Sequence, residues 1–163
     1  IVLGHGGGPT HVCPDEDPGE AADLNELDAD GLKWMSIHGV AEAVRRMHQQ
    51  SCSRVSLLYL QNCCKAEASV VYETMGSSDF VLASQPILGA PNNYYAGFIE
   101  SLVDHANRSG LEIARKIVAH EDAQDFAVLA CLNLDSMIEL VRNLEQFCDS
   151  CAQALASVFE SIS

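Results

Sequence analysis

The chain has 163 residues, of which 48% are hydrophobic and 20% charged, as expected for one globular domain with a sizeable core. Its formal net charge of −14 argues against nucleic-acid binding, which needs basic patches to displace counterions. The charge leaves open an attraction for basic substrates or a simple gain in solubility. No run approaches the roughly 18 apolar residues of a membrane helix, and no signal peptide is visible before the opening strand-like run.

The N-terminal part of the chain opens with a buried strand at residues 1–4 and a glycine-rich turn at residues 5–9. A polar segment over residues 10–35 follows, and it contains eight acidic residues. We expect a long acidic loop there, functional or disordered. Ser36 then offers an N-cap for an amphipathic helix over about residues 37–49.

The middle of the chain holds a second strand over residues 54–60, which ends shortly before two adjacent cysteines. A short helix is predicted over residues 66–74 and a third strand over residues 80–83. A loop rich in Pro, Gly and Asn comes next.

The C-terminal part is predicted to contain two helices, over about residues 95–107 and 110–120, with Ser109 as the cap of the second. A fourth strand is predicted over residues 126–132. Asp135 is then the predicted cap of a long amphipathic helix that runs to the end of the chain.

Strands that alternate with helices and read as continuous apolar runs predict an α/β fold with a mostly parallel sheet covered on both faces. We assign residues 1–163 to a single domain of this kind. Ligands of such sheets bind at the carboxyl ends of the strands, where His5 and Cys63 lie. Because neighbouring strands are about 4.8 Å apart, we expect the imidazole and the thiol to approach each other over one edge of the sheet.

This juxtaposition suits nucleophilic catalysis by a cysteine. The reactive species is the thiolate, which a nearby imidazole or the positive end of a helix favours. Cys63 would have both, from His5 and from the helix that starts near Ala66. The N–H groups of Gly6 and Cys63 could point at a developing oxyanion. A structural cysteine beside a turn histidine is the alternative.

The remaining cysteines give little sign of a disulfide framework. The total is seven, an odd number without framework spacing, which favours a reducing compartment. Cys148 and Cys151 form a C-x-x-C, but the pair lies in the middle of a predicted helix rather than at its N-terminus. We therefore interpret it as helix packing rather than as a redox motif.

Three stretches, "GHGGG", "LQNCCKAEASVVYE" and "FVLASQPILGAPNNYYAGFIESL", together resemble the clostripain family of clan CD cysteine peptidases. The spacing from Cys63 to Tyr72 and Glu73 matches the family and selects Cys63 rather than Cys64 as the nucleophile. The tail "DFAVLACLNLDSMIELVRNLEQF" is similar to the late strand and helix of the family, so the resemblance covers nearly the whole chain in the right order.

The resemblance implies a caspase-like three-layer α/β sandwich and a cysteine endopeptidase (a hydrolase of the thiol protease type), with His5 as general acid and Cys63 as nucleophile. Family members carry a further strand-helix portion before the histidine. We expect this chain to lack that portion, so that an N-terminal segment or a companion chain would complete the sheet. Self-cleavage, common in the family, would fall in the acidic loop, and the resemblance also allows secretion.

Two acidic positions of the family pattern are neutral here. Gln61 stands where the family has an Asp that helps to select basic residues, and Gln85 stands where the family has a Glu. Because a neutral amide cannot balance a buried guanidinium, basic specificity is not expected from these positions. We expect Gln61 and Ser84 to line the first specificity pocket. The alternative is a catalytically inactive caspase-like module that binds or regulates.

The proposed chemistry requires no cofactor and no metal. Calcium is left open, because clostripain-like enzymes can depend on it and the acidic loop includes "ELDADG", although position twelve of an EF-hand loop would be Ile37. A zinc site from His5, His11, Cys13 and Cys63 has suitable ligand types but fits no zinc spacing. The other histidines are predicted to have surface or packing roles, and the aromatic residues that could line a substrate groove are Trp34, Tyr94, Tyr95 and Phe98.

Overall fold

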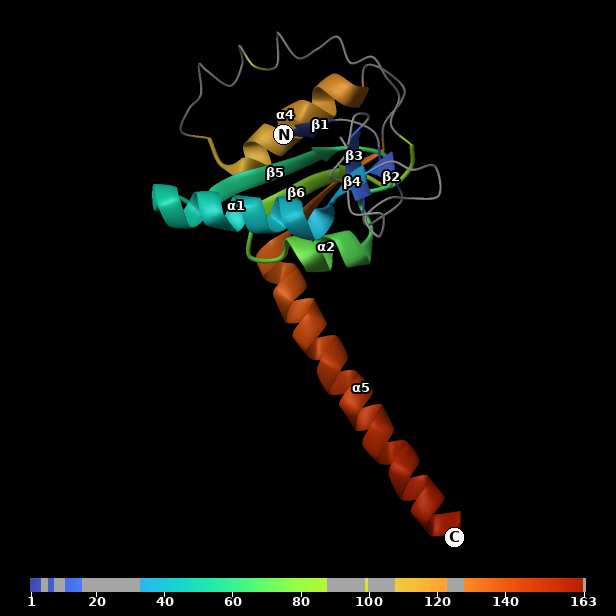
Figure 1. Ribbon diagram of the computed structural model, residues 1–163. Coiled ribbons are helices and arrows are strands. Elements are labelled where there is room, and N and C mark those ends of the chain that lie inside the picture. The colour runs from blue at the N-terminus through green and yellow to red at the C-terminus, as the bar shows by residue number, and fades with distance from the viewer. Residues whose placement is uncertain are drawn as a thin grey trace.

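The protein is described by a computed structural model that covers residues 1–3, 6–7, 11–15, 33–87, 99, 108–122 and 128–162 (Figure 1). These residues form two sheets and several helices, which confirms the α/β part of the predicted fold class. The strands are β1 (Val2–Leu3), β2 (Gly6–Gly7), β3 (His11–Asp15), β4 (Lys33–Ser36), β5 (Val55–Gln61), β6 (Ser78–Ser84) and β7 (Leu129–Asn133). The helices are α1 (Ile37–Ser51), α2 (Ala68–Thr74), α4 (Gly110–Asp122) and α5 (Leu134–Ile162).

The larger sheet has four strands in the order β1-β5-β6-β7. β1 pairs in parallel with β5, with Val2 opposite Leu60 and Leu3 opposite Gln61, and β5 pairs in parallel with β6. The first two predicted strands, which carry His5 and Cys63 at their ends, are therefore direct neighbours that run in the same direction.

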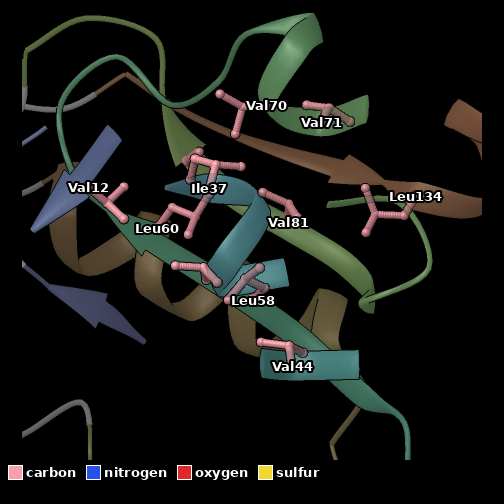
Figure 2. Packing of buried hydrophobic residues seen from close by; sticks show 11 residues of the cluster. Val12, Ile37, Val44, Leu58, Leu60, Val70, Val71, Val81 and Leu134 are labelled. Atoms are coloured by element: carbon pink, nitrogen blue, oxygen red, sulfur yellow. The ribbon is translucent and has the colours of Figure 1, made fainter. Parts of the chain in front are cut away.

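Helices cover both faces of this sheet. α1, α2 and the start of α5 lie against one face, where Leu58, Leu60 and Val81 meet Ile37 and Leu134 in the main hydrophobic cluster (Figure 2). On the other face, a second cluster joins Tyr59 and Leu82 of the sheet to Ala114 and Ile117 of α4. Alternation along β5 explains the division, since successive side chains of a strand point to opposite faces.

The smaller sheet is antiparallel, in the order β2-β3-β4, and it occupies both ends of the predicted acidic loop. The expectation of an uninterrupted loop over residues 10–35 is therefore wrong at its margins, because β3 and β4 form a ladder that includes the pairs His11–Ser36 and Asp15–Lys33. Val12 is fully buried and joins the main cluster, which anchors this hairpin to the domain. The intervening residues 16–32 lie outside the described part.

β7 runs antiparallel to β6, which the expectation of a mostly parallel sheet did not include. The path of the chain explains the direction. α4 begins at the amino edge of the sheet, where Gly110 packs on the backbone of Ser56 and on the Phe80 ring. The helix crosses to the carboxyl edge, where the Gln85 N–H donates to the carbonyl of Val128 at 3.4 Å. β7 therefore starts at the carboxyl edge and must return in the opposite direction.

Two of the predicted helix caps, Ser36 and Ser109, are confirmed. The Ser36 hydroxyl accepts a hydrogen bond from the Gly39 N–H at 3.0 Å and begins α1, as predicted. Ser109 caps α4, since its hydroxyl accepts from the Glu112 N–H at 3.3 Å while the Glu112 carboxylate accepts from the Ser109 N–H at 2.9 Å. This reciprocal pair is a capping box.

The predicted cap of the last helix is wrong by two residues. Asn133 caps α5, because its side-chain oxygen accepts from the Ser136 N–H at 3.0 Å. Asp135 lies in the first turn and pairs instead with Arg54 at 3.0 Å, and Arg54 also pairs with Asp79 at 2.9 Å. Beyond this anchored start, α5 projects away from the rest of the molecule (Figure 1).

Candidate functional site

The turn that follows β5 carries Cys63 and Cys64 to the carboxyl edge of the sheet. Cys64 has a φ of 56°, in the left-handed region that non-glycine residues rarely occupy. Its N–H donates to the carbonyl of Pro86 at 3.2 Å, and the N–H groups of Lys65 and Ala66 both donate to the carbonyl of Ser84, at 2.8 and 2.9 Å. Three backbone hydrogen bonds, to Ser84 at the end of β6 and to Pro86 just after it, thus hold this turn in a strained conformation of the kind frequent at functional sites.

Gly6 lies directly against the backbone of Cys63. A Cβ atom at position 6 would stand 2.5 Å from the Cys63 carbonyl oxygen and 2.9 Å from the Cys63 nitrogen, so only glycine fits without movement. β2, which lies within the segment predicted as a glycine-rich turn, therefore meets the turn that follows β5. Gly6 and Cys63, the two residues predicted to supply oxyanion donors, are thus adjacent.

His5 itself lies outside the described residues, so the predicted distance between its imidazole and the Cys63 thiol stays a prediction. Its surroundings in the sequence are fixed on both sides. Leu3 pairs with Gln61, and Gly6 packs on Cys63. Leu3 and Gly6, the described residues on either side of His5 in the sequence, thus lie beside the end of β5 and the turn after it.

Gln61 and Ser84, the predicted pocket residues, are neighbours at the carboxyl edge. The parallel register of β5 and β6 pairs Leu60 with Ala83, so Gln61 and Ser84 occupy the next position along each strand. Both are buried, and their side chains belong to the face that α4 covers, because they follow Tyr59 and Leu82 by two residues. The Ser84 hydroxyl donates to the carbonyl of Pro86 at 3.1 Å.

Trp34 extends the site on the side of the small sheet. Its half-buried ring lies 3.0 Å from the position that a Cβ of Gly7 would take, and it meets the His11 ring edge-on with 6.3 Å between centroids. Gly7 directly follows Gly6, so the indole packs on the residue next to the one that contacts Cys63. The role of Trp34 in lining a substrate groove stays a prediction, and Tyr94, Tyr95 and Phe98 lie outside the described residues.

The described cysteines differ in their access to solvent. Cys63 and Cys64 are half-buried, whereas Cys52, Cys148 and Cys151 are exposed and reduced. The interpretation of the C-x-x-C as packing within this chain is therefore wrong, because both thiols lie on the projecting part of α5. Cys131 is half-buried in β7, where burial raises the pKa of its thiol above the ordinary value.

In the turn after β5, Lys65 is a buried residue that the sequence did not indicate. It lies two residues after Cys63, is completely buried, and engages other groups of the protein. A buried ammonium is costly unless it is paired or hydrogen-bonded. In the sequence, Lys65 lies between an apolar strand and an amphipathic helix, and a lysine at such a place is ordinarily expected on the surface.

A cavity of about 260 Å³ opens between the start of α1 and α2. His38 and Glu73 stand at its rim, with 3.0 Å between the imidazole Nδ1 and a carboxylate oxygen. The two residues are 35 positions apart in sequence, so no local pattern could have indicated the pair. The prediction for His38 gave it a surface or packing role and did not include Glu73 as its partner. Apolar walls from Ile37 and Val70 complete the cavity.

No metal site is formed by the described residues: within those ranges, no group of three or more His, Cys, Asp or Glu side chains has a suitable arrangement. The acidic residues considered for calcium fall in residues 16–32, outside the described part. Among the described helices, none has the length and apolar character needed to cross a membrane.

Comparison with known proteins gave no match: no family model, no curated protein and no solved structure corresponds to this chain.

Proposed function

We propose that the chain is a cysteine endopeptidase of clostripain type, with Cys63 as nucleophile and His5 as general acid, in a caspase-like α/β sandwich. The observation that carries the proposal is the packing of Gly6, the residue after His5, on the backbone of Cys63. The parallel pairing of β1 with β5 adds support, because it brings both strand ends to the carboxyl edge where ligands of such sheets bind.

In the proposed reaction, the Cys63 thiolate attacks the carbonyl carbon of the scissile peptide bond. The N–H groups of Gly6 and Cys63 stabilise the oxyanion of the tetrahedral intermediate. The His5 imidazolium gives its proton to the leaving amine as the C–N bond breaks, and a thioester remains on Cys63. Water activated by His5 then hydrolyses the thioester and restores the thiol.

The first specificity pocket is proposed to lie at Gln61 and Ser84. These two buried side chains occupy adjacent register positions next to the turn of the nucleophile. Because neither carries a charge, this part of the pocket offers no countercharge for a basic substrate side chain. The substrate side chain that is preferred at the P1 position is therefore to be measured with the peptide library described next.

A fluorogenic peptide library, incubated with the full chain, tests the proposal. Turnover should be lost in Cys63→Ala and kept in Cys52→Ala, a matched control in an exposed thiol outside the site. Iodoacetamide should label Cys63 well ahead of the other thiols, including the exposed Cys148. Absence of turnover in folded protein, with Cys63 labelled no faster than Cys148, would leave the non-catalytic module as the better interpretation.

Self-processing within residues 16–32 is part of the proposal, and the hairpin gives it a specific consequence. β3 and β4 flank this segment and are held together by a ladder from His11–Ser36 to Asp15–Lys33. A cut between them would leave the fragments joined by that ladder and by the buried Val12. A processed sample should therefore show two bands on a denaturing gel but the intact mass in native mass spectrometry.

A companion strand is proposed along the outer side of β5. Within the described residues, β1 pairs with β5 at Leu60 and Gln61, and the stretch from Val55 to Leu58 pairs with β6 on its other side. A hollow of about 170 Å³, lined by Val55, Leu57, Ile113 and neighbouring residues, adjoins this edge. Unpaired edges are typical sites of strand addition. An N-terminal segment or a separate chain would supply the strand.

A further inference from the structure

The long helix α5 carries an apolar face that the domain covers only at its beginning. Leu134 is completely buried in the main cluster, and Met137 is packed against the same cluster. From residue 142 to residue 160 every position is exposed. The exposed side chains include Leu144, Leu155 and two phenylalanines, Phe147 at 64% and Phe159 at 72%. Such a row of large apolar groups on a projecting helix marks an interaction surface.

The apolar residues follow a heptad repeat. Alternating steps of three and four connect the positions that form the seam, which are Leu134, Met137, Val141, Leu144, Cys148, Cys151, Leu155 and Val158. This spacing of 3.5 residues is the pattern of helices that wrap around one another. The first positions of the seam are those that pack on the domain, so the exposed seam continues a buried one. Residues 142–162 extend for about 30 Å, or three heptads.

Charged residues of α5 avoid the seam. The helix has five acidic residues and one arginine, and Glu145 alone among them flanks the seam, while the others lie on the opposite face. Pairs of opposite charges that flank a seam can select a partner helix with a complementary sequence, and this seam has Glu145 as its one flanking charge. Helices that lie on membranes carry basic residues on their polar face, whereas this polar face is acidic. Both observations favour a partner with the same uncharged seam.

We propose that the exposed part of α5 pairs with α5 of a second copy of this chain. Such pairing sets Leu144, Leu155 and the seam cysteines against their counterparts and leaves the acidic faces in solvent. In each copy, the two phenylalanines that flank the seam would together bury on the order of 500 Å². The leucines and Val158 raise the total toward the roughly 1,200 Å² of a specific interface. The pairing is independent of whether the domain is a peptidase.

Sedimentation of the full chain across a dilution series tests the proposal. The wild type should have at least twice the 17.6 kDa mass of one chain at the higher concentrations. The double variant Leu144→Glu/Leu155→Glu should sediment as one chain, because it places four carboxylates in the paired seam. Gln146→Glu/Gln153→Glu adds the same charge on the opposite face and should keep the wild-type mass.

Two results would overturn the proposal. One is a wild type that sediments as a single chain throughout the series. The other is an assembly that the Leu144→Glu/Leu155→Glu variant retains, since the contact would then lie elsewhere. Flotation of single chains with phosphatidylcholine vesicles would assign the face to a membrane surface and count against pairing. Circular dichroism of both double variants checks that α5 remains helical, so that a loss of mass reports on the seam.

Discussion

Replacing Gly6 by alanine is the sharpest perturbation of the proposed site. The added Cβ would stand 2.5 Å from the Cys63 carbonyl oxygen, whereas ordinary contact begins at 3.4 Å, so the two backbones must separate by about 0.9 Å. Overpacking of this kind costs about 1–3 kcal/mol of folding free energy. A displacement near 1 Å at a catalytic group can reduce the rate by on the order of 100-fold.

Two measurements on the Gly6→Ala variant check this reasoning. Urea denaturation should show a free energy of unfolding lower by about 1–3 kcal/mol, and kcat/KM for the best library peptide should fall by on the order of 100-fold. Gly39→Ala is the matched control. Its Cβ would meet only the Ser36 hydroxyl at 3.3 Å within a helix, so activity should persist and stability should stay level or rise by up to about 1 kcal/mol.

The reasoning is refuted if Gly6→Ala matches the wild type in both the denaturation midpoint and the turnover. That result would mean that Gly6 and Cys63 are not in contact in solution, and the proposed meeting of the two strand ends would lose its support. A variant that loses stability but keeps full turnover would retain the contact and remove Gly6 from the oxyanion site.

Two further predictions concern the helix caps. Ser36→Ala removes the acceptor of the Gly39 N–H and should lower the free energy of unfolding by about 1 kcal/mol in urea denaturation, with no effect expected from Ser53→Ala. At the start of α4, hydrogen bonds from the Ser109 N–H and hydroxyl lower the pKa of Glu112 below its ordinary value of 4.5. The stabilisation is therefore present above about pH 4.5 and lost as the pH falls through the depressed pKa. Ser109→Ala should reduce the dependence of the melting temperature on pH in that acidic range, and an unchanged dependence would contradict the capping box.

Much of the local structure followed from the sequence, because hydrophobic period and capping chemistry act over a few residues. The apolar run of β5 and the helical spacing of α1 predicted those elements to within two residues, and Ser36 and Ser109 were recognised as caps. Asn133 was missed in favour of Asp135 because both residue types cap well, and the choice depended on Arg54, which is distant in sequence and binds the aspartate.

The sequence by itself determined that buried strands alternate with amphipathic helices and that two of those strands end at His5 and Cys63. Tertiary structure decided which parts of the chain meet: Gly6 on Cys63, His38 beside Glu73, β3 with β4, and the reversed direction of β7. The physical reason is that each of these contacts joins segments whose approach depends on the path of the chain between them. Helix propensity and hydrophobic spacing depend only on residues that are close in sequence. They could therefore indicate that α5 is amphipathic, but not that the domain leaves most of its apolar face exposed.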